Sequence, residues 1–362
     1  MATSTIHGVR IAGIASAVPS TVRPVSDMGD VFGVEEVKKI SLSTGVERRH
    51  VTGEKLRCSD LCYSSARRLL DELKWDPQTV DGVFFVSQSC DFPYPATACI
   101  LQMRLGLPKT CAAFDVNLGC SGFIYGLWMA SSLMAASGLT RVLLLSGDAA
   151  TRPPSPRDRS TALLFGDAGV ATALELDPAA PPLAFSLGTD GSGWKHLIMP
   201  AGLCTSRHPR DEKTAIRKEA ESGNWRSDED VYMDGAEVFA FTLREVPPLI
   251  SGVLEQSKWT RDEVEYFVFH QANKFMLTYL AKSMKLPLPK VPLSLKEYGN
   301  TSSASIPLTI NAELGETVRT RPLKLLMAGF GVGYSWGACT ATLGPMVSPP
   351  VILVDDSEAW QC

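Results

Sequence analysis

Cys120 is the residue best placed to do chemistry, because it lies between small residues at an expected strand-to-helix turn. A short apolar run, 112–116, precedes it, and a long one, 123–136, follows. A helix that is apolar on every side is a buried helix, so Cys120 would lie at a buried helix N-terminus. Unpaired N–H groups and the positive end of the helix dipole favour a thiolate there. The alternative is a free cysteine that fills core space.

Two polar residues follow apolar elements later in the chain. His270 ends an expected strand, 264–270, and Asn300 lies in a loop of small residues before an apolar helix at 306–314. Ligands of α/β proteins gather at the carboxyl ends of strands, which would bring His270 towards Cys120. His270 could equally be a hydrogen-bonded core histidine, and Asn300 could cap the helix or form an Asx turn.

A glycine-rich turn, 328–337, follows a further expected strand. It lacks the Lys-Ser/Thr ending and the following helix of a phosphate-binding loop. Its glycines would instead let backbone N–H groups approach a reacting carbonyl oxygen.

The elements that must position these residues occur twice. A helix, a Lys-Trp pair and a strand recur at an offset of 184 residues, and a further strand recurs at an offset of 182: 69–75 with 253–259, 80–86 with 264–270, and 143–147 with 325–329. Such a shared period predicts a duplicated α/β half rather than a solenoid, whose periods are far shorter. We take the halves as 1–180 and 181–348, followed by a C-terminal tail at 349–362.

Helices alternate with apolar strands along both halves. We expect helices at 34–43 and 59–75, the second capped by Ser59, and strands at 9–18, 80–86, 112–116 and 141–146. This alternation predicts an α/β fold with a mainly parallel or mixed sheet covered on both faces. The stretch 205–230 is polar, and we expect it to be a mobile excursion.

Composition excludes several classes of protein. The 362 residues are 45% hydrophobic and 20% charged, and the net charge of −4 argues against a nucleic-acid-binding protein. Nine cysteines without a C-x-x-C pair fit neither a disulfide framework nor a zinc site, and they suit a reducing cytoplasm. Neither a signal peptide nor an apolar run of membrane-spanning length is present. We therefore expect a cytoplasmic protein with no membrane span, no metal site and no nucleic-acid partner.

The motifs acquire a specific meaning when they are read in order. They are Gly-Cys-Ser-Gly, Leu-Phe-Gly-Asp, His-Gln-Ala-Asn, Gly-Asn-Thr-Ser-Ser-Ala-Ser and Gly-Phe-Gly-x-Gly-x-x-Trp-Gly. This set resembles the β-ketoacyl-acyl carrier protein synthase III family of the thiolase superfamily, over nearly the whole chain. The resemblance implies a five-layer αβαβα thiolase-like fold made of two duplicated halves, and a homodimer.

The resemblance also implies roles for individual residues. Cys120 would be the nucleophile, His270 and Asn300 the other catalytic residues, and the backbone N–H groups of Cys120 and Val332 the oxyanion hole. Cys120 would take an acyl group from acyl-CoA or an acyl carrier protein, and a decarboxylated malonyl-type thioester would then attack it. We expect no permanently bound cofactor. Residues expected to contact substrate are Phe92, Arg152, Asn273, Lys274, Phe330 and Gly331.

Several positions depart from the family pattern. Lys39 and Ser43 stand where members that use a coenzyme A primer usually carry Trp and Arg, and Phe275 replaces another Arg. Losing these groups removes phosphate pairing and stacking with a nucleotide. We therefore expect a divergent member of the family rather than the housekeeping acetyl-CoA enzyme, with a longer or carrier-borne acyl primer and a role in lipid or fatty acid biosynthesis, in a secondary-metabolite or cell-envelope pathway. Val332 replaces the middle glycine of the glycine-rich turn. Either this replacement accompanies a change of acyl donor, or the valine only repacks the pocket and the donor is unchanged.

An acidic carrier protein needs a basic docking patch, for which the candidates are Lys274, Lys282, Lys285 and Arg152. The other explanation for these residues is an ordinary solvated face.

Three other classes of function remain open. The same acyl-Cys120 could be attacked by an alcohol or an amine, which would make the protein an O- or N-acyltransferase. Gly-x-Cys-x-Gly also suggests a hydrolase nucleophile elbow, although the duplication and the buried helix argue against it. A non-catalytic partner subunit would usually have lost the three catalytic residues, all of which are present.

Overall fold

A computed structural model of the protein describes residues 1–201 and 213–361, and its strands form two large mixed sheets. The six-stranded sheet has the order β17-β2-β8-β7-β5-β6, and the five-stranded sheet has the order β1-β9-β16-β15-β14. The first comprises β2 (Val9–Pro19), β5 (Gly82–Val86), β6 (Ala112–Val116), β7 (Arg141–Ala149), β8 (Asp167–Leu176) and β17 (Ile352–Val354). The second comprises β1 (Ala2–Ile6), β9 (Leu183–Thr189), β14 (Tyr266–Phe269), β15 (Leu323–Gly331) and β16 (Ser335–Leu343).

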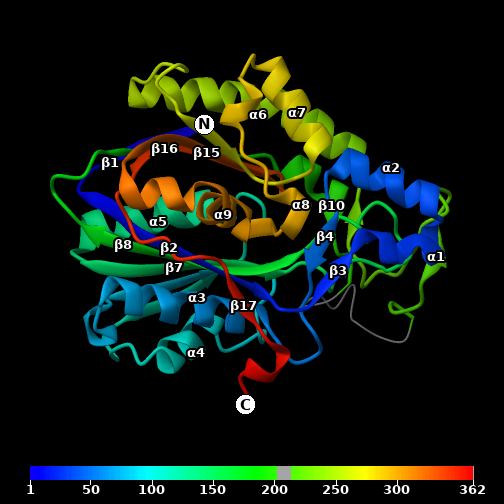
Figure 1. Cartoon of the computed structure of the whole chain (residues 1–362), viewed down its shortest axis with the longest axis horizontal. Coiled ribbons are helices and arrows are strands. Elements are labelled where there is room, and N and C mark those ends of the chain that lie inside the picture. The colour runs from blue at the N-terminus through cyan, green and yellow to red at the C-terminus, as the bar shows by residue number, and fades with distance from the viewer. Residues whose placement is uncertain (202–212, 362) are drawn as a thin grey trace.

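Helices complete a five-layer arrangement around the two sheets (Figure 1). One outer layer, α3 (Cys58–Leu73) and α4 (Thr97–Arg104), covers the six-stranded sheet. The other, α6 (Gly235–Ser257) and α7 (Lys274–Ser283), covers the five-stranded sheet. Helices α5 (Gly122–Ser137) and α9 (Ser305–Thr320) lie between the sheets. The predicted αβαβα fold is confirmed.

The duplication is visible in the strand order. Strand β5 is parallel to β7, which is antiparallel to β8, and β14, β15 and β16 repeat the same pattern. In each half an outer helix precedes the first of these strands and a central helix precedes the second. The repeated Lys-Trp and strand motifs therefore mark equivalent positions in the two halves.

Helix α5 lies between the two sheets because it is apolar on all of its faces. Phe123, Ile124 and Leu127 are fully buried, and the helix packs against strands of both sheets. Gly126 lets it approach closely, since a Cβ there would lie 2.8 Å from Val86 and 2.9 Å from Leu144. Apolar strands covered on both faces supply the other side of these contacts.

The predicted strand 112–116 matches β6, while the strand predicted at 141–146 continues to Ala149. Helix α3 begins at Cys58, so Ser59 lies within its first turn instead of capping it, and Arg57 is the N-cap residue. Ser59 Oγ donates to Asp91 at 2.8 Å. The hydroxyl expected to cap the helix thus binds a distant carboxylate.

Each end of the chain adds a strand to the sheet formed mainly by the other half of the chain. Strand β1, which the sequence analysis did not predict, pairs antiparallel with β9 in the five-stranded sheet. Residues 349–362, expected to be a tail, contribute β17, which pairs parallel with β2 in the six-stranded sheet. Both are edge strands whose few buried residues leave only a weak apolar pattern.

The polar stretch expected at 205–230 is only partly described, because 205–212 lie outside the described residues. Its remainder contains a short hairpin of β11 (Lys218–Glu219) and β12 (Trp225–Arg226). Asn224 and Asp230 are buried there, and Arg217 donates two hydrogen bonds to Asp230 at 2.9 and 3.0 Å. The described part of this polar stretch therefore contains buried, hydrogen-bonded polar residues as well as exposed ones.

Short elements gather at one end of the sheets (Figure 1). They are β3 (Val22–Pro24), α1 (Gly29–Phe32), α2 (Val34–Thr44), β4 (Arg48–His50), β10 (Leu197–Ile198), β13 (Tyr232–Met233) and α8 (Leu295–Tyr298). Throughout the part of the chain that the structure describes, no helix combines the length and the apolar character needed to cross a membrane.

Candidate active site

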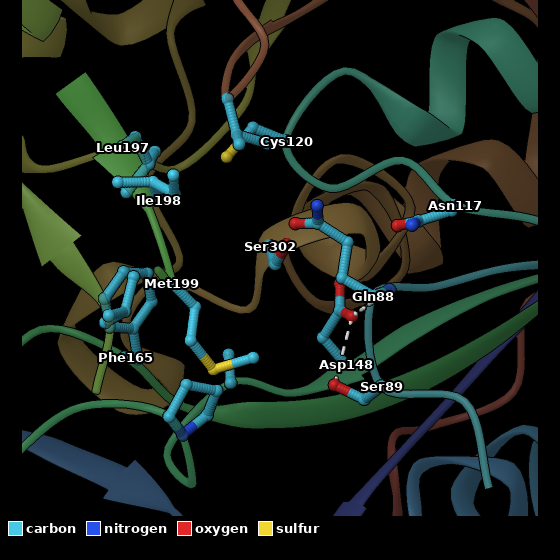
Figure 2. Close-up of a pocket in the computed structure, with 14 residues that line it drawn as sticks. Gln88, Ser89, Asn117, Cys120, Asp148, Phe165, Leu197, Ile198, Met199 and Ser302 are labelled. Atoms are coloured by element: carbon cyan, nitrogen blue, oxygen red, sulfur yellow. Dashed lines mark hydrogen bonds between the residues drawn. The ribbon is translucent and has the colours of Figure 1, made fainter. Parts of the chain in front are cut away.

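Cys120 lies between the end of β6 and the start of α5, as predicted. It is 9% exposed and lines a cavity of about 340 Å³ together with residues from both halves of the chain. Its sulfur points into this cavity, opposite Leu197 and Ile198 (Figure 2). The position makes the thiol reachable by a small acyl group while shielding it from bulk water.

The glycine-rich turn between β15 and β16 closes against Cys120. A Cβ at Gly331 would lie 2.7 Å from the Cβ of Cys120, and the residue has φ +155°, so only glycine fits there. The backbone N–H groups of Val332 and of Cys120 itself act to lower the pKa of the Cys120 thiol, so both favour negative charge on the sulfur. Val332 keeps this donor while its side chain lines the cavity, so the replacement of glycine narrows the pocket.

Burial raises the pKa of the Cys120 thiol to about 11, with the negative charge of Asp148 contributing in the same direction. The hydrogen bonds from the Val332 and Cys120 N–H groups oppose this shift without cancelling it. The expectation that the helix N-terminus favours a thiolate is therefore not met, because the pKa of the thiol lies above its ordinary value. Desolvation by both halves of the fold outweighs the helix end.

His270 follows β14 and is 1% exposed. Its backbone N–H donates to Ala328 at 2.8 Å, and its Nδ1 lies 2.7 Å from Ser305 Oγ. Burial lowers the pKa of the imidazole to about 4, although a backbone hydrogen bond with Ser302 opposes the shift. The imidazole is consequently neutral at pH 7, and Ser305 and the Ser302 backbone fix its position.

His270 and Cys120 are joined through consecutive residues of the glycine-rich turn. The Phe330 ring meets the His270 ring edge-on with centroids 6.0 Å apart, and the next residue, Gly331, abuts Cys120. His270 does not itself line the 340 Å³ cavity.

Asn300 is 5% exposed and belongs to the loop that leads into α9. Its Oδ1 accepts a hydrogen bond from the Ser302 N–H at 2.9 Å, which is the Asx-turn interaction considered from the sequence. Its Nδ2 makes only a long contact of 3.5 Å with the Ala272 carbonyl. The amide is thus anchored through its oxygen, and its N–H₂ group retains donor capacity.

Asp148 is a residue of this site that the sequence analysis missed. This buried carboxylate accepts hydrogen bonds from the Gln88 N–H at 2.7 Å and from Ser303 Oγ at 2.9 Å. It therefore joins one wall of the cavity to the loop that carries Asn300. Ser302, between these anchors, has a strained φ of 52°. The position of Asp148 at the carboxyl end of β7 is a signal that the sequence did contain.

The residues expected to contact substrate lie in different parts of the structure. None of the six lines the cavity, but Gly331 lies against Cys120 and Phe330 contacts the His270 ring. Arg152 donates to the carbonyls of Gly53 and Leu56 at 2.9 and 2.7 Å, and Arg57 lies over the Phe92 ring. Asn273 caps α7 by accepting from the Met276 N–H at 2.8 Å. Lys274 lies against Gly45 at the end of α2.

The pKa values of Cys120 and His270 predict the pH dependence of thiol reactivity. A thiol of pKa about 11 is mostly protonated at neutral pH, so its thiolate fraction grows roughly tenfold for each pH unit up to that value. His270, with a pKa of about 4, stays neutral over the same range. We expect alkylation of Cys120 by iodoacetamide to accelerate about tenfold per unit between about pH 6 and 9, measured by peptide mass spectrometry. A rate that levels off near pH 7 would contradict this assignment.

The five-layer fold, with a buried cysteine at the start of its central helix, defines the class as thiolase-fold acyltransferases. Comparisons with known proteins narrow the class. Models of the family described as 3-oxoacyl-(acyl-carrier-protein) synthase III match residues 114–191, and its C-terminal region matches residues 254–343.

Relatives extend the similarity to nearly the whole chain. The β-ketoacyl-acyl-carrier-protein synthase III of Methylococcus capsulatus is 32% identical over 91% of this chain and 97% of its own, and that of Geobacillus kaustophilus is 30% identical over 93% and 99%. A crystal structure of 3-oxoacyl-(acyl-carrier protein) synthase from Burkholderia xenovorans aligns with a TM-score of 0.91 and 40% identity, covering 98% and 99%. The chain belongs to the β-ketoacyl-acyl carrier protein synthase III family, a family of condensing acyltransferases.

Proposed function

We propose that this protein forms an acyl-Cys120 intermediate and condenses it with a decarboxylated malonyl-type thioester. The observation that carries the proposal is a thiol that opens into a cavity and whose pKa the Val332 and Cys120 N–H groups act to lower. Donors in this position can stabilise the oxyanion of a thioester carbonyl during acyl transfer. The family to which the chain belongs supplies the reaction class.

In the first half-reaction, Cys120 attacks the carbonyl carbon of an acyl thioester. A bond forms between Sγ and the acyl carbon, the bond to the donor sulfur breaks, and the Cys120 proton leaves with the donor thiol. His270 is neutral at pH 7, because burial lowers the pKa of its imidazole to about 4, and we assign it to the second half-reaction. The cavity beside Cys120 then holds the acyl group.

In the second half-reaction, His270 and the Asn300 N–H₂ group hold the thioester oxygen of the extender. Loss of CO₂ leaves an enolate, whose carbon attacks the acyl carbonyl and releases the Cys120 thiolate. The Ser305 contact to Nδ1 and the Ser302 contact to Oδ1 support these roles by fixing the orientation of both side chains. Neither side chain lines the cavity, which leaves the cavity to the acyl group.

The acyl donor is proposed to arrive on an acidic carrier protein. Helices α2 and α7 border a surface groove that combines exposed Leu42 and Phe275 with Lys274 and Lys282. Such a surface suits an acidic helix with apolar residues better than a nucleotide, because Lys39 and Ser43 stand where the family pattern has the Trp and Arg that would hold a nucleotide. Lys285 follows α7 directly. Arg152 already serves two backbone carbonyls, so we leave it out of this patch.

The proposed function is tested by supplying an acyl thioester, on CoA or on a carrier protein, together with malonyl carrier protein. We expect an acyl adduct on Cys120, CO₂ release in equal amount to the new β-ketoacyl product, and faster acylation from the carrier than from CoA. Acyl transfer to an alcohol or amine without CO₂ would show the alternative acyltransferase. Absence of any adduct on Cys120 would overturn the proposal.

We further propose that the protein is a homodimer joined along β6, with the halves 1–180 and 181–348 as its structural repeats. Strand β6 is an edge strand of the six-stranded sheet. The Ala112 N–H donates to Asp81, and the Val116 carbonyl accepts from the Ser87 N–H. Because hydrogen bonds alternate along a parallel pair, Ala113 directs its N–H away from β5, towards a partner strand.

Replacing Ala113 with proline tests this edge. Proline removes the outward N–H without removing a hydrogen bond to β5, and it is tolerated on edge strands. We expect the mass measured by sedimentation to fall to that of a monomer. The matched variant Ala113→Val keeps the N–H and should remain dimeric. A dimeric Ala113→Pro variant would show that the copies meet elsewhere.

A further inference from the structure

The cavity beside Cys120 has two chemically different walls (Figure 2). Phe165, Leu197, Ile198 and Met199 form an apolar wall. The facing wall carries hydrogen-bonding side chains, namely those of Gln88, Ser89, Asn117, Asp148 and Ser302. Ligand cavities are mostly apolar, and the few polar groups that they contain fix the orientation of the ligand and provide specificity.

Part of the polar wall serves the protein itself. Asp148 accepts from Ser303 Oγ, and Ser89 Oγ donates to Asp148 at 3.3 Å while accepting from the Ala149 N–H at 3.1 Å. The side-chain amides of Gln88 and Asn117 are different, since within residues 1–201 and 213–361 neither forms a hydrogen bond. They are the groups of this wall left free for a ligand.

The Gln88 amide lies close to the nucleophile. Its Oε1 lies against the Cα of Gly119, the residue before Cys120, where a side chain would collide with it. The Gln88 backbone is held in place because its N–H donates to Asp148 at 2.7 Å. In Figure 2 the amide projects from the polar wall towards the space below the Cys120 sulfur. A group meeting this amide would therefore lie near the thioester end of a bound acyl chain.

We propose that the acyl group preferred by Cys120 carries a hydroxyl or carbonyl oxygen near its thioester, at the third carbon, which hydrogen-bonds with the Gln88 amide. A plain alkyl chain would strip water from that amide without replacing its hydrogen bonds, whereas an oxygen at this position restores one of them. A site built to bind a polar group discriminates against the analogue that lacks it. The apolar wall accommodates the rest of the chain.

This inference rests on the proposed acylation of Cys120, in which Sγ bonds to the acyl carbon as the donor thiol leaves with the proton. The preference appears in that first half-reaction, so extender chemistry does not affect its measurement. We suggest pantetheine thioesters of butyrate, 3-hydroxybutyrate (each enantiomer) and 3-oxobutyrate, which share one carbon count. Hexanoyl and 6-hydroxyhexanoyl thioesters test whether the position of the oxygen matters.

Intact-protein mass spectrometry should show the wild type acylated by one 3-hydroxybutyryl enantiomer or by 3-oxobutyryl roughly ten- to a hundredfold faster than by butyryl. The 6-hydroxyhexanoyl thioester should gain nothing over hexanoyl. In Gln88→Leu, which keeps the bulk and loses the amide, butyryl should react at least as fast as the oxygenated substrates. The control Gln256→Leu, whose side chain binds Thr5 on another face, should keep the wild-type order.

Two results would overturn the inference alone: a wild type that is acylated by butyryl as fast as by the oxygenated chains, or a Gln88→Leu variant with the wild-type order. If no thioester acylates Cys120 in any variant, the proposed function fails and this inference fails with it.

Discussion

We expect the Cys120→Ala variant to form no acyl adduct and to lose condensation activity by at least about 10⁴-fold. The thiol is the only group at the cavity wall suited to become a thioester within the described residues, and the Val332 and Cys120 N–H groups are directed at its sulfur. Alanine is smaller than cysteine, so the close approach of Gly331 is not disturbed. The measurement is the mass of the protein after incubation with an acyl thioester, together with the rate at which the β-ketoacyl product forms.

Cys111 provides the matched control for this change. It is a free cysteine just before β6, more accessible than Cys120, and burial with the nearby charge of Asp81 raises the pKa of its thiol to about 11 as well. Cys111→Ala should leave both the adduct and the activity in place. An adduct that persists in Cys120→Ala, or that disappears in Cys111→Ala, would mean that the nucleophile is misassigned.

The Asn300→Ala variant should lose the condensation step by about 10²–10³-fold. One well-placed donor to an oxyanion contributes about 2.7–4 kcal/mol, and the Asn300 N–H₂ group is the donor that alanine removes. Acylation of Cys120 should be affected much less, because the N–H groups of Cys120 and Val332 serve that step. Single-turnover acylation and steady-state condensation, measured on the same preparation, separate the two steps.

Asn300→Asp is the companion variant, because it keeps the Oδ1 that accepts from the Ser302 N–H and replaces the N–H₂ donor with a carboxyl oxygen. It should lose condensation to a similar extent, with a melting temperature closer to that of the wild type than Asn300→Ala. Equal losses of acylation and condensation in both variants would show that Asn300 supports the fold of the loop instead of holding the extender.

Local sequence patterns were sufficient where a structural feature depends on neighbouring residues. The apolar run after Cys120 predicted a central helix, since no face of α5 could be left to water. Strand 112–116 and the turn that follows it were also predicted, because their residue types leave few other conformations. The repeated Lys-Trp and strand motifs indicated the duplication that the two sheets display.

Local patterns could not predict contacts between residues that are far apart in the sequence. Asp148 and Ser303 are 155 positions apart, and only the packed fold brings the carboxylate to that loop. The sequence did not predict strands β1 and β17. Both are edge strands with few buried residues, so their sequences lack a clear apolar pattern. Arg152 satisfies two backbone carbonyls of a loop about one hundred positions earlier, which no motif could show.

The sequence by itself determined the class of protein, the position of the thiol at a turn between a strand and a helix, and the order of the polar residues around it. Tertiary structure decided the ionisation of that thiol and the two-sided chemistry of its cavity. The physical reason is that desolvation and hydrogen-bond satisfaction depend on everything packed around a group. For Cys120 and Gln88, those surroundings come from segments far away in the chain.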